Sequence, residues 1–170
     1  MGAHTIFQAG ETRTVLDGVR RIVRTLHESS RAAEKTLGLS GAQLFVLQTL
    51  ADAPGLSLNA LAERTHTHQS SVSTVVSRLV ERGLVLRAPS ADDGRRLELR
   101  VSAEGRRLVG RAPDAAQARL IHAIEQLAPE KRRVLARALL ELTQKMDVDR
   151  HAAVMFFDHS ERKGKRTIRG

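Results

Sequence analysis

Residues 66–83 alternate large apolar side chains with short polar ones at the spacing of an α-helix. The apolar positions fall at i, i+3, i+4, i+7 and i+8 and are Val72, Val75, Val76, Leu79 and Val80. This spacing places all five side chains on one face. The other face carries short hydrogen-bonding groups and one guanidinium, with no acidic residue before Glu81. Gly83 then ends the predicted helix, because glycine readily adopts the left-handed conformation that follows a helix.

Three helices are predicted before this one. Apolar residues at helical spacing over residues 11–36 indicate a long first helix, whereas residues 1–10 are weakly patterned and are expected to lie outside it. Ser40 and Gln43 form a capping-box pattern ahead of a second helix, whose dense apolar residues indicate burial. Ser57 caps a short third helix over residues 58–65.

Two short helices joined by a tight turn, the second with a polar outer face, have the layout of a helix-turn-helix. Either His68 or Thr67 is expected to cap the second helix. The period then changes, and residues 84–87 and 97–101 indicate two strands around a turn. A hairpin attached to a helix-turn-helix in this way is a wing.

Two more helices are predicted after the wing. Ser102 caps a helix that runs to Leu127, and Pro113 inside it is expected to produce a kink. Pro129 stands at the first position of a last helix that ends near Val148. The long first helix and these last ones carry more apolar surface than a small winged domain can cover, which predicts a two-fold helical dimer interface.

Composition narrows the functional classes. The chain has 170 residues and a formal net charge of +9, which favours a polyanionic partner such as DNA. Aromatic residues make up only 2%, which argues against stacking of single-stranded bases. Cysteine is absent, so disulfides and thiolate metal sites are excluded. Without a long apolar run or a signal-peptide pattern, the protein is expected to be soluble and cytoplasmic, with no membrane partner.

The order of these elements resembles the MarR family of bacterial transcription regulators over roughly residues 11–148. The most specific match covers residues 56–105, where LSLNALAERTHTHQSSVSTVVSRLVERGLVLR and DDGRRLELRVSAEG resemble the family's helix-turn-helix, wing and following helix. Asp93-Gly94-Arg95 matches the wing signature of the family. The resemblance implies a winged-helix homodimer that binds pseudo-palindromic double-stranded DNA, with Arg95 entering a minor groove.

The predicted fold is therefore mainly α, a winged helix-turn-helix with a small β-hairpin wing and a helical dimerisation region. We expect an N-terminal arm and first dimerisation helix over residues 1–36 and a DNA-binding domain over 37–102. Dimerisation helices follow over 103–157 and a basic tail over 158–170. Phe156 and Phe157 are expected to anchor the tail on the partner subunit or on their own chain, and the tail itself either adds phosphate contacts or is solvated.

The candidate DNA-binding residues lie on the polar face of the predicted recognition helix and on the wing. The N-terminal half of that helix enters the groove in helix-turn-helix proteins, and the candidates for base contacts there are Gln69, Ser70, Ser71, Ser73 and Thr74. Ser77 and Arg78 are candidates for phosphate contacts. Arg87 and Arg96 either contact phosphate or are ordinary strand-edge charges, and His68 either touches phosphate or is an exposed turn residue.

Other candidate chemistry is weaker. In the resemblance, family effectors, often aromatic acids, occupy a cleft between the DNA-binding and dimer regions, and the residues proposed for it here are Arg24, His27, Arg31 and Phe45. His66 and His68 lack a third ligand nearby, so no metal is predicted, and His122 is expected to be packed. No nucleophile–base pair, phosphate loop or paired carboxylates are found, so neither an enzyme nor a cofactor is predicted.

Two functional hypotheses remain. In the first, the protein is a dimeric regulator, most simply a repressor, that a small anionic or aromatic effector releases from its operator. In the second, it binds DNA without a small-molecule effector and is controlled by its concentration or by a protein partner.

Overall fold

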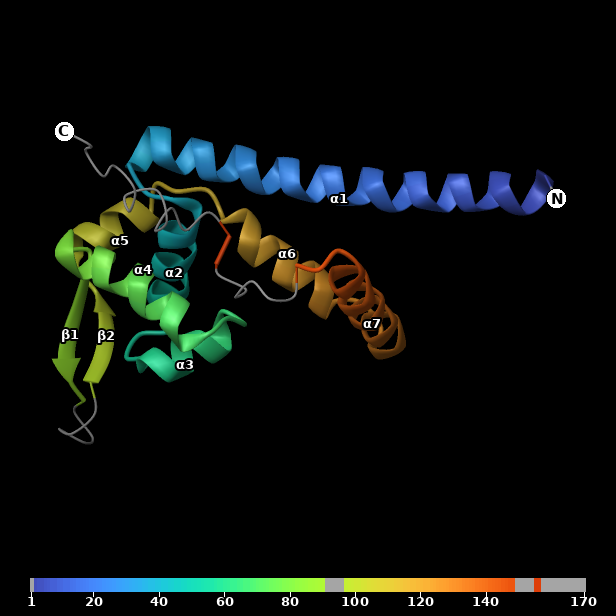
Figure 1. Cartoon of the computed structure of the whole chain (residues 1–170). Coiled ribbons are helices and arrows are strands. Elements are labelled where there is room, and N and C mark those ends of the chain that lie inside the picture. Colours follow the sequence, from blue (N-terminus) through green and yellow to red (C-terminus); the bar gives the residue numbers. More distant parts are fainter. Residues whose placement is uncertain (1, 91–96, 149–154, 157–170) are drawn as a thin grey trace, which may run out of the picture.

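The computed structural model describes residues 2–90, 97–148 and 155–156, with side chains from residue 10 onward. Its element order is helix, helix, helix, helix, two strands and three further helices (Figure 1). The bounds are α1 Gly2–Leu37, α2 Gly41–Asp52, α3 Leu58–Arg64, α4 Gln69–Glu81, β1 Val85–Pro89, β2 Leu97–Val101, α5 Ala103–Val109, α6 Ala116–Glu125 and α7 Pro129–Lys145. The fold is thus mainly α with one antiparallel hairpin, as predicted.

Serine residues begin three of these helices as the sequence predicts. The Ser40 hydroxyl accepts a hydrogen bond from the backbone N–H of Gln43, whose side chain in turn accepts from the Ser40 N–H, completing the capping box. Ser57 and Ser102 cap α3 and α5 in the same manner, each accepting from the N–H three residues on.

The buried core lies where α2 meets α4 and the hairpin. Four members of the valine and leucine stripe of α4 are fully buried, namely Val72, Val75, Val76 and Leu79, and Val80 is partly buried. Seven residues of α2 are buried, so the prediction of a buried second helix is confirmed. In the hairpin, Val85 pairs with Val101 and Arg87 with Leu99. Val85, Leu99 and Val101 are buried, so one face of the hairpin packs on the same core.

Two boundaries differ from the prediction. Helix α1 begins at Gly2 rather than near residue 11, because residues 2–10 contain no proline and Gly10 inside a helix costs only about 1 kcal/mol. The stretch predicted as one kinked helix is two separate helices, with α5 ending at Val109 and α6 beginning at Ala116. Pro113 has no N–H and its ring clashes with the carbonyl of a preceding turn, which ends the helix instead of bending it.

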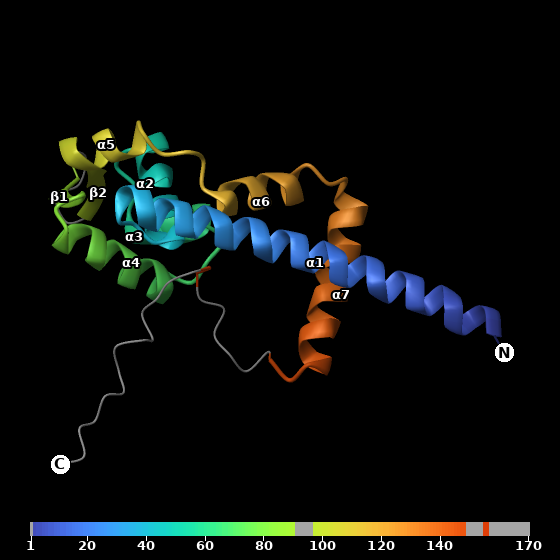
Figure 2. The same cartoon turned by 90° about the horizontal axis from the view of Figure 1, so that it is seen from above.

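The two longest helices are poorly covered by the rest of the chain. The N-terminal part of α1 projects away from the winged unit, and α7 lies apart from α1 beyond α6 (Figures 1 and 2). The exposed apolar side chains of α1 are Val15, Leu16, Val19, Ile22 and Val23. No residue of α7 is buried, and a face at heptad-like spacing on it consists of Leu135, Leu139, Leu142 and Met146.

The segment after α7 returns to its own chain. Met155 is buried in the hydrophobic core, and Phe156 borders the hollow beside the helix-turn-helix. Phe156 is itself 49% exposed and Phe157 lies outside the described residues, so anchoring by these two side chains, on the partner subunit or on their own chain, stays a prediction.

Gly105 generates a prediction for stability. A methyl group added there would meet the Leu84 carbonyl oxygen at 2.5 Å and a Val101 methyl at 2.7 Å, at the junction of α5 and the wing. We expect Gly105→Ala to lower the free energy of unfolding by about 1–3 kcal/mol, as overpacking does. Urea unfolding measures the change. Gly110→Ala is the control, since its methyl meets nothing nearer than 3.5 Å, and an equal loss in both variants would contradict the packing argument.

Candidate nucleic-acid interface

A tight turn sets the angle between α3 and α4. Thr65 is buried and its hydroxyl donates to the Leu61 carbonyl at 2.8 Å, which closes the end of α3. His66 then adopts φ 50°, in the left-handed region, and the Thr67 N–H donates to the Ala62 carbonyl at 3.0 Å. The chain thereby reverses within a few residues and delivers α4 with its apolar stripe turned inward.

The outer face of α4 is uncovered along most of its length. His68, Gln69, Ser70 and Thr74 are exposed, and the side chains that are half-buried are Ser73, Ser77 and Arg78. Ser71 differs from the prediction, because it is only 9% exposed and lies on the flank that packs inward. Ser71 lies at the boundary between the polar and the apolar face of α4. The pattern of residue types alone does not show on which side of this boundary a serine falls.

The N-terminus of α4 has no side-chain cap. His68 occupies the N-cap position in extended conformation, φ −74° and ψ 143°, and its side chain makes no capping hydrogen bond. Thr67, the other predicted cap, lies one residue outside that position. Backbone N–H groups of the first turn therefore face outward beside Gln69 and Ser70, an arrangement that suits a phosphate oxygen.

Arginine side chains flank the helix on both sides. Arg87 on β1 donates to the Ser77 hydroxyl at 3.3 Å, so the base of the wing is held against the recognition helix. Arg82 at the end of α4 donates to the Gly38 carbonyl at 2.6 Å. Arg95 and Arg96, the predicted wing-tip contacts, lie outside the described residues.

The histidines are placed as follows. His66 Nε2 lies 3.4 Å from a carboxylate oxygen of Glu125, linking the helix-turn-helix to α6. Within the described residues, no three potential ligands gather closely enough to hold a metal ion. His122 was expected to be packed, and this was wrong: its side chain is exposed at the edge of a cavity. Over the same part of the chain, no helix combines the length and apolarity needed to cross a membrane.

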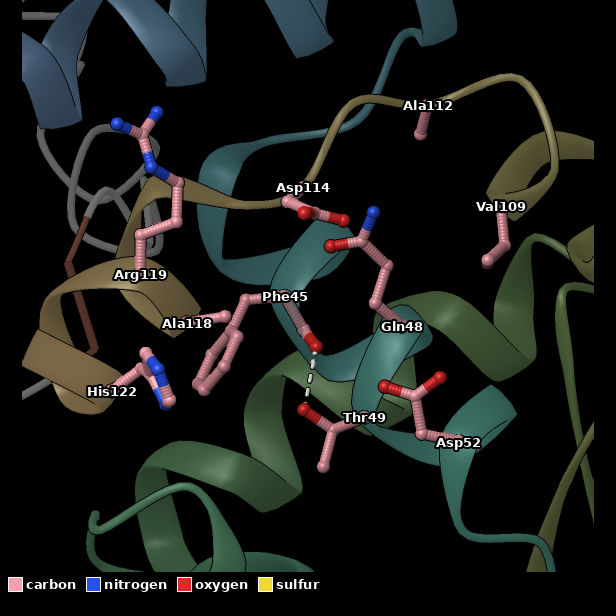
Figure 3. Close-up of a pocket in the computed structure, with 10 residues that line it drawn as sticks. All are labelled: Phe45, Gln48, Thr49, Asp52, Val109, Ala112, Asp114, Ala118, Arg119 and His122. Atoms are coloured by element: carbon pink, nitrogen blue, oxygen red, sulfur yellow. Dashed lines mark hydrogen bonds between the residues drawn. The ribbon is translucent and has the colours of Figure 1, made fainter. Parts of the chain in front are cut away.

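That cavity, about 360 Å³, lies between α2, the α5–α6 connection and α6 (Figure 3). The Phe45 ring stands at its centre, with the Gln48 amide beside Asp114 at one rim and Asp52 further along α2. The remaining lining residues are Thr49, Val109, Ala112, Ala118, Arg119 and His122. Apolar surface, two carboxylates, an amide and the His122 imidazole thus line one opening, while the Arg119 guanidinium is turned away from the Phe45 ring (Figure 3).

Of the four residues predicted for an effector cleft, only Phe45 lines this cavity. Arg24, His27 and Arg31 lie exposed on α1 and are not part of its wall. Arg24 is paired with Glu28 at 2.7 Å, and this hydrogen bond raises the pKa of the Arg24 guanidinium. Sequence reasoning missed Gln48, Arg119 and His122, because the break between α5 and α6 that brings them together was predicted as a continuous helix.

Comparison with known proteins shows which sequences the chain is similar to. A sequence model described as "MarR family" matches residues 37–96. The HTH-type transcriptional repressor Rv2887 of Mycobacterium tuberculosis is 30% identical over 122 residues, 72% of this chain and 88% of that protein. An uncharacterized HTH-type transcriptional regulator of Mycobacterium leprae is 35% identical over 127 residues, 73% of this chain and 86% of that protein.

Solved structures resemble the fold. A MarR/EmrR family transcriptional regulator from Acinetobacter superposes with a TM-score of 0.54 at 20% identity, covering 80% of this chain and 96% of that one. Rv2887 has been solved in complex with p-aminosalicylic acid; that structure has a TM-score of 0.45 and 28% identity, covering 73% of this chain and 94% of its own.

The uncapped start of α4 yields a prediction. His68→Ser places a hydroxyl where the backbone already has N-cap geometry. We expect this change to raise the free energy of unfolding by about 0.5–2 kcal/mol, the usual worth of an N-cap. Thermal and urea unfolding measure it. His68→Ala is the control, since it removes the imidazole without adding an acceptor. A serine variant no more stable than the alanine variant would show that the helix start is satisfied in another way.

Proposed function

This chain belongs to the MarR family of transcription regulators, and on that basis we propose that it is a homodimeric, sequence-specific repressor in the bacterial cytoplasm. The observation that carries the proposal is the outer face of α4. It presents exposed Gln, Ser and Thr side chains with no acid before Glu81, on a helix whose other face is fully buried. Such a face suits a major groove, where base edges offer donors and acceptors.

The proposed contacts divide by position along α4. Gln69, Ser70, Ser73 and Thr74 face the bases, because the first half of a recognition helix enters the groove. His68, Ser77, Arg78 and the neighbouring Arg87 meet phosphates. Buried Ser71 is left out of this set. Arg95 keeps the minor-groove contact that the family resemblance implies, and Arg96 is proposed to contact phosphate rather than to be a strand-edge charge.

The uncovered faces of α1 and α7 support the dimer. Five large apolar side chains on α1 and four at regular spacing on α7 are exposed in the single chain. Burying them against a second copy is favourable by roughly 25 cal/mol per Å² of apolar surface. A two-fold dimer would place two recognition helices about 34–36 Å apart, to meet successive major grooves of a pseudo-palindromic operator.

The cavity beside Phe45 is the proposed effector site. The Phe45 ring suits an aromatic ligand, and the nearby His122 suits one that carries a carboxylate. The relative Rv2887, solved with p-aminosalicylic acid, supports the same chemical class. An effector releases the operator only if it binds the DNA-free arrangement more tightly than the DNA-bound one.

Binding to the DNA immediately upstream of the coding sequence tests the proposal. We expect tight binding, steeply weakened by salt, that survives an excess of random duplex. Fluorescence anisotropy over a salt series measures both properties. Complete loss of binding to the random competitor would leave a basic winged protein without this operator.

A double substitution tests base reading. Gln69→Ala with Thr74→Ala should weaken operator binding by about 10- to 100-fold and leave binding to random duplex within about twofold, because base contacts carry the discrimination. Thr36→Ala is the control, since its hydroxyl bonds back to its own helix as that of Thr74 does, but on α1. Equal weakening on both DNAs would mean that these side chains only position the protein.

The dimer is tested on α7. We expect Leu139→Glu to shift the protein from dimer to monomer, because a carboxylate would be buried in an apolar interface. Light scattering after gel filtration reports the mass. Arg137→Glu makes a similar carboxylate on the opposite face of α7 and should remain dimeric. A dimeric Leu139→Glu variant would place the interface elsewhere.

A further inference from the structure

Helix α6 begins without a cap of its own. Ala115 occupies the N-cap position and makes no side-chain hydrogen bond, because alanine has no acceptor. Ala115 and Ala116 are nevertheless buried, at 2% and 6% exposure. Buried N–H groups at a helix start are costly unless something else accepts their hydrogen bonds.

Side chains from two other helices supply the missing partners. The Gln48 Oε1 of α2 accepts from the Ala115 N–H at 2.9 Å, and the Gln48 Nε2 donates to the Pro113 carbonyl at 3.0 Å. The Ser29 hydroxyl of α1 accepts from the Ala116 N–H at 3.3 Å. The Gln48 amide therefore holds the α5–α6 connection on both sides, and the reversed amide would place like against like at each contact.

The connection held in this way is the junction between two parts of the molecule. On one side, α2 is packed directly on α4 through buried residues such as Leu47 and Val76. On the other side, α6 leads into α7, none of whose residues is buried. Residues 110–115 between α5 and α6 contain Pro113 and form no helix, so a change of angle is least costly there.

Gln48 also lines the cavity described above. Its amide stands beside Asp114 at the rim, with Phe45 one helical turn away on α2 (Figure 3). A ligand in the cavity that offers both an acceptor and a donor near this rim competes directly with the Pro113 carbonyl and the Ala115 N–H. Loss of the Gln48 contacts leaves those two groups unpaired, which favours a different placement of α6.

We propose that Gln48 is the positioning residue that couples the cavity to the angle of α6, and through it to the distance between the two recognition helices. The inference rests on the proposed function for the dimer and the effector. With the cavity empty, the amide holds the α6 orientation that suits DNA. A small aromatic acid or amide that hydrogen-bonds to Gln48 frees α6 to change its orientation. Ligand binding and the angle of α6 are thus coupled through this one side chain.

The absence of cysteine makes the test direct. Glu81→Cys, at the exposed far end of α4, gives one spin-labelling site in each protomer. Pulsed electron paramagnetic resonance then measures the distance between labels in the dimer, with and without p-aminosalicylate as the probe. The three proteins compared are the Glu81→Cys background alone, with Gln48→Met, and with Gln126→Met. Gln126 is the matched control, because it is an exposed glutamine just after α6 that does not line the cavity.

In the background and in Gln126→Met we expect a single distance between labels without ligand. We expect p-aminosalicylate to shift this distance and to lower operator affinity by about tenfold. In Gln48→Met we expect a broadened distribution of distances between the labels without ligand. We also expect the operator affinity to be about the same with and without p-aminosalicylate. Hydrogen exchange at the Ala115 amide, whose acceptor is lost, should accelerate by at least about tenfold. Gln48→Glu, which keeps only the acceptor, should give intermediate protection at Ala115.

The outcomes separate this inference from the proposed function. A Gln48→Met protein with the same distance distribution, the same amide exchange and the same response to the probe overturns the role of Gln48. If p-aminosalicylate binds none of the proteins by calorimetry, the effector assignment is wrong and the coupling to this ligand class is overturned with it. If no distance between labels is observed, the dimer is wrong. In both of these cases unchanged amide exchange in Gln48→Met also overturns the positioning role.

Discussion

The structure depends on the packing of the α4 valine–leucine stripe against α2. Val72, Val75, Val76 and Leu79 have no exposed surface, and each buried side chain of this kind contributes about 1.5–3 kcal/mol. This packing determines which side of α4 remains in contact with solvent. Gln69, Ser70 and Thr74, which are assigned to the bases, are exposed and lie outside this packing, so substitutions there can change the site that is read without changing the fold.

Much of the winged unit follows from local rules that the sequence displays directly. Ser40, Ser57 and Ser102 are caps by residue type and spacing, and the α4 stripe follows from helical periodicity. The predictions that were wrong concern places where a contact distant in sequence decides between two locally possible structures. Pro113 was expected to bend a helix and instead ends one, because the freed connection is satisfied by Gln48 from a distant helix. A partner 67 positions away in the chain has no local signature.

The candidate site could be predicted only in part, for the same reason. The polar face of α4 lies on one helix and is visible in one stretch of sequence, except where Ser71 lies at the boundary between two faces. The cavity combines α2 with residues on both sides of a helix break, so of its lining residues only Phe45 was anticipated. Arg24, chosen for its charge, is paired on the surface of α1.

The hydrogen bond between Arg82 and the Gly38 carbonyl ties the last turn of α4 to the end of α1. Helix α1 has 36 residues and is therefore about 54 Å long. Its C-terminal end is held at the recognition helix, and its exposed apolar side chains lie toward the other end. A tilt of about 5° at the fastened end displaces the far end by about 5 Å, a full helical turn's rise. A small change in the angle between α1 and α4 would thus produce a large displacement of the α1 surface that is proposed to contact a second copy of the chain.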